Sequence, residues 1–187
     1  MALLYLLEGF LTAEECRASS RAMDAGVPDP AEVLGAGIVS LDDVRRAESL
    51  DVSPEVLALV EARLDRERDR IARHFGLTLT DREGTGFVRY QPGGFYRAHV
   101  DWSDSPAWPG AARRRVAAVV FLNASRAWDP HGEFDGGVLR LLPDGSAEAP
   151  IDIVPRRGTL VAFPATLPHE VTTVENGVRA AAVDWFY

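Results

Sequence analysis

Between Ser53 and Gly76, apolar side chains recur with the spacing of an amphipathic α-helix. Serine at the cap followed by proline marks the start of this helix, and glycine marks its end. A shorter helix is predicted to begin after Thr12, which has the spacing of a capping box with Glu15, and to run to about Ala25. Both helices are expected to pack their apolar faces on a sheet.

The rest of this N-terminal part is less regular. Residues 1–10 are mostly apolar and predict a buried first strand. Residues 26–38 are rich in proline, glycine and alanine and predict a loop. A short second helix is expected from Ser40.

Beyond residue 76 the pattern changes to short apolar or alternating runs between turn residues, which is typical of β-strands. Eight runs are predicted as strands: residues 86–91, 95–100, 116–123, 137–142, 151–154, 159–163, 169–174 and 178–186. The pattern predicts an α+β protein with a double-stranded β-helix core, the jelly-roll or cupin-like fold, and N-terminal helices packed on one sheet. We expect a single domain over residues 1–187, with residues 1–76 as mainly helical support and residues 77–187 as the jelly-roll core.

Composition and charge exclude several classes of function. The formal net charge of −8 argues against a nucleic-acid partner, because binding to the phosphate backbone needs basic surface. The only cysteine is Cys16, which excludes an intrachain disulfide and a multi-cysteine zinc site. The chain has no lysine, so it cannot form a Schiff base through one, and any fixed cation for a substrate carboxylate must be an arginine.

No apolar run reaches the length of a membrane span, and the first residues lack the basic segment and cleavage site of a signal peptide. We therefore expect a cytoplasmic protein with no membrane partner. The sequence leaves the oligomeric state open.

Four residues carry the clearest candidate chemistry. His99 and Asp101 are two positions apart, so on a strand their side chains point to the same face. His169 begins a later predicted strand and is expected to approach from the opposite wall of the barrel. Two histidines and one carboxylate on one side of a metal leave positions open, as iron–oxygen chemistry requires. Arg179, in the last predicted strand, is costly to bury without an anionic partner.

Several segments, in this order, match one known family. The match begins weakly at FLTAEEC and is strong in RYQPGGFYRAHVDW, RRRVAAVVFLN, FDGGVLRLLPDG, IDIVPRRGTLVAF, LPHEV and GVRAAAVDWFY. Together they resemble the 2-oxoglutarate and Fe(II)-dependent dioxygenases of the prolyl 4-hydroxylase type. Several ordered segments are far more specific than a single motif.

The resemblance implies an iron site beside a cosubstrate pocket. The catalytic Fe(II) ligands would be His99, Asp101 and His169. Arg179 would hold the C5 carboxylate of 2-oxoglutarate through paired hydrogen bonds, and Val171 would form an apolar wall. Tyr90 would line the same pocket, and its alternative role is that of an ordinary core aromatic. With O2 as the other cosubstrate, the reaction would hydroxylate an unactivated C–H bond and release succinate and CO2, with ascorbate as a candidate reductant.

This sequence departs from the family at Phe121, where some relatives have a tyrosine whose hydroxyl helps to hold the C5 carboxylate. The substrate would be a prolyl residue of a peptide or protein, or a small amino-acid-like molecule. Two aromatic loops, residues 103–114 and 124–135, are candidate lids over the site.

Two other functions stay open. One is a non-catalytic jelly-roll protein that binds a metal or senses iron or 2-oxoglutarate, although a purely structural metal site would need neither an open side nor Arg179. The other, nucleic-acid dealkylation, would use the same metal ligands but fits poorly with the net charge of −8.

Overall fold

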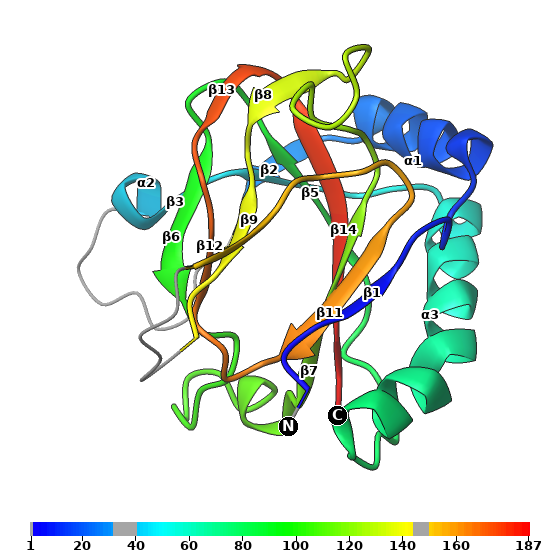
Figure 1. Ribbon diagram of the computed structural model, residues 1–187, viewed down its shortest axis with the longest axis vertical. Helices are drawn as coiled ribbons and strands as arrows, with labels where there is room; N and C mark the ends of the chain where they lie inside the picture. The colour runs from blue at the N-terminus through cyan, green and yellow to red at the C-terminus, as the bar shows by residue number, and fades with distance from the viewer. Residues whose placement is uncertain (1, 32–40, 144–149) are drawn as a thin grey trace.

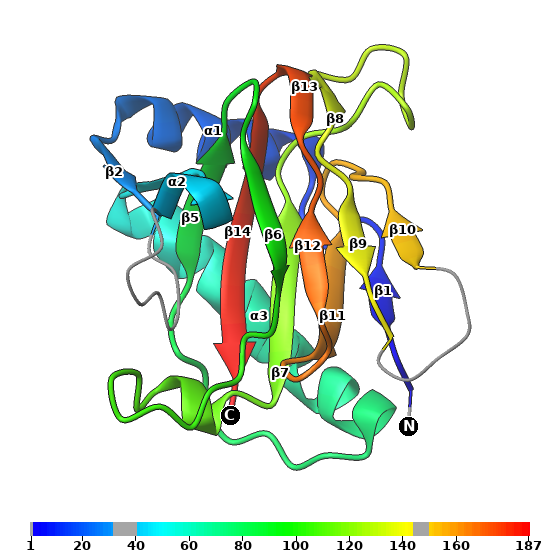
Figure 2. The same ribbon diagram turned by 90° about the vertical axis from the view of Figure 1, so that its left-hand side faces the viewer.

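The computed structural model describes residues 2–31, 41–143 and 150–187. Two antiparallel sheets face each other, and two long helices cover the outer face of the larger sheet (Figure 1 and Figure 2). The predicted α+β architecture, a jelly-roll core with N-terminal helices on one sheet, is confirmed.

The two long helices have the predicted bounds. α1 (Ala13–Ala25) begins after Thr12, whose hydroxyl accepts from the N–H of Glu15 while the Glu15 carboxylate accepts from the N–H of Thr12. α3 (Pro54–Phe75) ends at Gly76, whose φ of +66° lies in the left-handed region that favours glycine. No helix in the described ranges is long and apolar enough to cross a membrane.

The larger sheet contains seven strands, in the spatial order β1 (Tyr5–Leu7), β11 (Leu160–Pro164), β7 (Val116–Phe121), β14 (Arg179–Phe186), β5 (Gly86–Tyr90), β4 (Glu48–Leu50) and β2 (Pro28–Pro30). The smaller sheet contains five, in the order β10 (Ile151–Ile153), β9 (Leu139–Leu141), β12 (His169–Val171), β6 (Phe95–His99) and β3 (Arg45–Arg46). β8 (Phe134–Gly136) and β13 (Val174–Gly177) pair separately. The described residues also form a short helix, α2 (Leu41–Val44), and a 3-10 turn, Ala111–Arg113.

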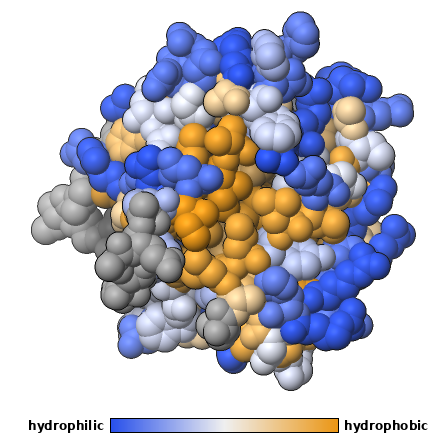
Figure 3. All heavy atoms as spheres, viewed as in Figure 1, coloured by the Kyte–Doolittle hydropathy of each residue, from blue (hydrophilic) through white to orange (hydrophobic). Residues whose placement is uncertain are grey.

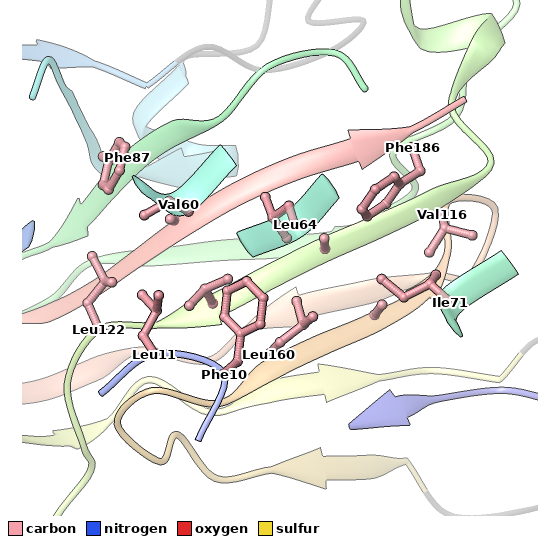
Figure 4. Close-up of a cluster of buried hydrophobic side chains, with 14 of the residues drawn as sticks. Phe10, Leu11, Val60, Leu64, Ile71, Phe87, Val116, Leu122, Leu160 and Phe186 are labelled. Atoms are coloured by element: carbon pink, nitrogen blue, oxygen red, sulfur yellow. The ribbon is translucent and has the colours of Figure 1, made fainter. Parts of the chain in front are cut away.

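β7 is buried on both faces because its side chains alternate between two hydrophobic clusters. Val116, Ala118 and Val120 join the cluster between the larger sheet and the helices. Figure 4 shows this cluster, in which Val60 and Leu64 of α3 lie over the strands. The alternate residues of β7 face the space between the sheets. The larger sheet is therefore anchored from outside, and its inner face is left for the site.

The N-terminal strands differ from the prediction. The first strand, β1, is an edge strand rather than a buried one, and Leu6 is 43% exposed. The predicted loop at residues 26–38 contains the edge strand β2, and its residues 32–38 lie outside the described ranges.

Apolar side chains gather in the middle of the face seen in Figure 1, with polar ones around them (Figure 3). The edge strands β1 and β10 lie on this side of the molecule.

The accessibility of the Cys16 thiol is a measure of how α1 packs, because this side chain is fully buried. Burial raises the pKa of the Cys16 thiol to about 11. The thiolate is the reactive form, so we expect very slow labelling by a disulfide reagent at pH 8 in the native protein and fast labelling in urea. The absorbance of the released thiol measures both rates. Equal rates with and without urea would contradict the packing of α1.

Candidate functional site

His99 and His169 are direct neighbours in the smaller sheet, because β12 pairs with β6 and places His169 opposite His99. The expectation that His169 approaches from the opposite wall is therefore wrong, and the two ring centroids are 4.2 Å apart. Asp101 follows the end of β6, and its N–H donates to the carbonyl of Ala165 at 2.9 Å. One ligand atom from each of the three side chains lies within 4.8 Å of the other two.

Both imidazoles are oriented by a backbone carbonyl two residues earlier. Nδ1 of His99 lies 2.8 Å from the carbonyl of Arg97, and Nδ1 of His169 lies 2.9 Å from that of Leu167. Each Nδ1 therefore carries the proton and donates, which leaves the Nε2 lone pair free for a metal. The two Nε2 atoms lie 3.6 and 3.5 Å from the oxygens of Asp101. This donor set fits a metal such as Fe(II) with one side open.

The electrostatics of the cluster favour an ionised aspartate and a neutral histidine. Burial by itself would raise the pKa of Asp101, but attraction to His169 and His99 outweighs it and holds the pKa well below its usual range. The nearby indole N–H of Trp185 also favours the charged carboxylate, although no hydrogen bond of ordinary geometry joins the two groups. Burial lowers the pKa of His169, so this imidazole is neutral near pH 7. A carboxylate and neutral imidazoles are the forms that bind metal.

Arg179 faces this cluster from the larger sheet and is 2% exposed. Its Nε donates to the carbonyl of Gly137 at 2.9 Å, and its guanidinium lies 5.0 Å from the ring centre of Tyr90 and 5.5 Å from that of Phe121. No carboxylate of the described residues forms an ion pair with it, and burial lowers its pKa. A buried guanidinium without an anionic partner indicates a site for an anionic ligand.

One cavity of about 520 Å³ joins the three candidate metal ligands to Arg179. Tyr90 and Val171 line the same cavity, and most of its other inner walls are apolar: Val88, Ala117, Val119, Leu139 and Val183.

Four other residues at the cavity have little or no signal in the sequence. Tyr96 stacks on His99, with ring centroids 3.5 Å apart. Glu83, Arg114 and Trp185 also line the cavity, but they lie far apart along the chain. Of these, only Trp185 follows from strand periodicity, because it shares the face of Arg179 on β14.

The two candidate lids differ in position. Trp108, in the loop of residues 103–114, lines the cavity. No residue of the loop 124–135 lines it, and Trp128 instead lies 3.2 Å from the guanidinium of Arg156. The structure therefore supports only the first loop as a lid.

Comparison with known proteins identifies similar sequences and folds. Residues 85–187 match the 2OG-Fe(II) oxygenase superfamily. The chain is 36% identical over 100 residues to a PKHD-type hydroxylase of Acaryochloris marina, a match that covers 53% of this chain and 39% of that relative. A PKHD-type hydroxylase of Cupriavidus pinatubonensis is 33% identical over 102 residues, with coverage of 53% and 40%. The matched segment thus spans about two fifths of these relatives.

Solved structures extend the similarity over nearly the whole chain. A prolyl-4-hydroxylase of Pseudomonas putida is 31% identical with a TM-score of 0.73, and the match covers 98% of this chain and 91% of that one. A prolyl hydroxylase of Trichoplax adhaerens, solved with a peptide of hypoxia inducible factor, has a TM-score of 0.77. It is 19% identical, and the match covers 98% of this chain and 83% of that one, so it supports the fold alone.

Proposed function

Because the chain belongs to the 2OG-Fe(II) oxygenase superfamily, as a member of the prolyl 4-hydroxylase type, we propose that it is a 2-oxoglutarate-dependent hydroxylase. The proposed Fe(II) ligands are His99, Asp101 and His169. Bound iron with 2-oxoglutarate and O2 supplies the oxidation of an unactivated C–H bond, with release of succinate and CO2. The observation that carries the proposal is one cavity holding both a three-donor cluster and a buried arginine that lacks an anion.

The residues around Arg179 prepare it for a carboxylate. Nε of Arg179 donates to the carbonyl of Gly137. Both terminal nitrogens of the guanidinium can therefore donate to the C5 carboxylate of 2-oxoglutarate. Phe121 supplies a ring but no hydroxyl, and Tyr90 lies on the guanidinium with its own ring. The apolar walls keep water away from the reacting groups, which strengthens the ion pair.

We propose a prolyl residue within a peptide as the substrate, in preference to a free amino acid. A free amino acid needs a cation for its α-carboxylate. Two of the arginines that line the cavity are already engaged, because Arg114 is paired with Glu83 and Arg179 is assigned to the cosubstrate. Inside a peptide both charges of the amino acid are absent, and the apolar walls suit a pyrrolidine ring. The name of the Pseudomonas putida relative supports the same choice.

The test is an anaerobic titration of the metal-free protein with Fe(II) and 2-oxoglutarate, followed by the weak visible charge-transfer band of a chelated keto acid. We expect a band in the native protein and none in His99→Ala. Oxygen consumption with ascorbate, our proposed reductant, then compares a proline-containing peptide with free proline. Metal uptake without a band would reject the hydroxylase and favour a non-catalytic metal-binding protein. A band with turnover of free proline alone would reject the peptide substrate.

Gly137→Ala is expected to weaken 2-oxoglutarate binding without touching the metal ligands. Gly137 has φ +59°, and a Cβ there would lie 2.9 Å from Cδ of Arg179 and 3.0 Å from Cγ2 of Val174. The arginine would have to move, because the surrounding core is closely packed. The charge-transfer titration measures the loss, which we expect to be at least tenfold. Gly9→Ala is the control, because its added Cβ would meet no atom within 4 Å and its φ of +69° lies in the same left-handed region as that of Gly137. Equal affinities in the two variants would contradict the role of Gly137.

A further inference from the structure

The backbone of Asp101 is held from two sides just beyond the end of β6. Its N–H donates to the carbonyl of Ala165 at 2.9 Å, and its own carbonyl accepts from Nη1 of Arg114 at 3.1 Å. No strand pairing holds this position, since β6 ends at His99. The Arg114 and Ala165 contacts therefore hold the backbone that carries the Asp101 carboxylate.

Arg114 is itself fixed by Glu83. The guanidinium is buried, and its Nε and Nη2 donate to the two carboxylate oxygens of Glu83, with the Nε contact at 2.5 Å. Glu83 also accepts from the hydroxyl of Tyr187 at 3.1 Å. A bidentate pair of this kind determines the plane of the guanidinium as well as its place.

The flat face of Arg114 lies on the indole of Trp185, 3.8 Å from the ring centre. Trp185 is on β14 and lines the cavity beside Asp101. Its N–H is buried and has no hydrogen-bond partner of ordinary geometry in the described part of the chain. Arg114 thus contacts both the backbone of one candidate metal ligand and the indole that stands next to it.

We propose that Arg114, held by Glu83, is a positioning residue that sets the metal affinity by fixing Asp101 and Trp185. The inference rests on the proposed function, because it takes Asp101 as a metal ligand. A pair that merely stabilised the fold would change the melting temperature and leave metal binding intact. Outer contacts that orient metal ligands typically change metal affinity about 10–100-fold when removed.

The test compares Arg114→Met with Arg114→Lys and the matched control Arg126→Met. Arg126 pairs with Asp135 in an exposed loop. Binding of Mn(II), measured by the EPR signal of the free ion, is expected to weaken by about 10–100-fold in Arg114→Met. The Mn(II) affinity of Arg114→Lys is expected to lie between those of the native protein and Arg114→Met. Lysine keeps the positive charge but cannot form the bidentate pair with Glu83 or stack on Trp185. The control should stay within twofold of the native protein.

Glu83→Gln covers the case in which Arg114→Met fails to fold, because it keeps the arginine and its stacking but removes the anionic partner. We expect it to weaken Mn(II) binding at least threefold and to shift the charge-transfer band. Native affinity in a folded Arg114→Met, or in Glu83→Gln, would overturn the proposal while leaving the hydroxylase standing. A native protein that takes up no Mn(II) would overturn both.

Discussion

Arg179→Met is expected to abolish 2-oxoglutarate binding while making the metal-free protein more stable. Two charge-assisted hydrogen bonds to the C5 carboxylate would be lost, which corresponds to a decrease in affinity of about 100-fold or more. The gain in stability follows because the guanidinium is 2% exposed and has no carboxylate partner in the described residues.

The size of that gain follows from two opposing effects. Burial of an ion costs several kcal/mol even after relaxation, and methionine fills a similar volume without charge. Loss of the donor to the Gly137 carbonyl costs about 1–3 kcal/mol. We therefore expect the free energy of unfolding to rise by about 1–2 kcal/mol, measured in urea.

Arg140→Met is the matched control for this prediction. Arg140 lies on β9, is paired with Asp152 and Glu170, and is partly exposed. Its loss should leave the charge-transfer band intact and lower stability by no more than about 1 kcal/mol. If Arg179→Met showed the charge-transfer band at the same concentrations of 2-oxoglutarate as the native protein, the assignment of Arg179 to the C5 carboxylate would be refuted. A large loss of stability would show that Arg179 is a structural residue.

Asp184→Ala is expected to produce the largest loss of stability of any single substitution discussed for this chain. The carboxylate is fully buried and accepts from Nη1 of Arg82 at 2.6 Å, Oγ1 of Thr85 at 2.8 Å and the N–H of Gly84 at 3.1 Å. It joins β14 to the segment between α3 and β5. Its removal takes one of three carboxylates from Arg82, which keeps Asp65 and Glu61, and leaves the partly buried donors of Thr85 and Gly84 without their acceptor. At about 1–3 kcal/mol for each unsatisfied donor, we expect a loss of about 3–5 kcal/mol.

A urea titration measures this loss as a lower midpoint at unchanged slope. The control is Asp135→Ala, which removes a half-exposed carboxylate paired with Arg126 and should cost less than about 1 kcal/mol. Since a domain of this kind is stable by only about 5–15 kcal/mol, Asp184→Ala should be close to unfolding at 37 °C. Equal midpoints for the two variants would show that the Asp184 network adds nothing to the fold.

Local signals in the sequence determined the helices and most of the strands. A capping box, a proline in the first turn and a left-handed glycine act within a few residues, so Thr12, Ser53 and Gly76 mark α1 and α3 without knowledge of the rest. The continuous apolar run of residues 116–121 likewise predicts a strand. Its two buried faces become clear only when the helices and the second sheet are in place.

The sequence alone also predicted the chemistry that we propose for the site, because residue type decides what can bind a metal or a carboxylate. It placed His99, Asp101, His169 and Arg179 in the right strands or beside them, but it put His169 on the wrong wall. Which strands become neighbours depends on the packing of the whole chain. The sequence around residues 99 and 169 therefore does not predict that their strands pair.

Only the tertiary structure showed the contacts between distant segments. Glu83, Arg114 and Trp185 come from three separate segments and have ordinary local surroundings in the sequence. The absence of a carboxylate partner for Arg179 in the described residues is likewise a property of the folded cavity. Residue type and local periodicity can be read from the sequence. The burial of side chains and the contacts between distant residues are set only when the two sheets pack against each other.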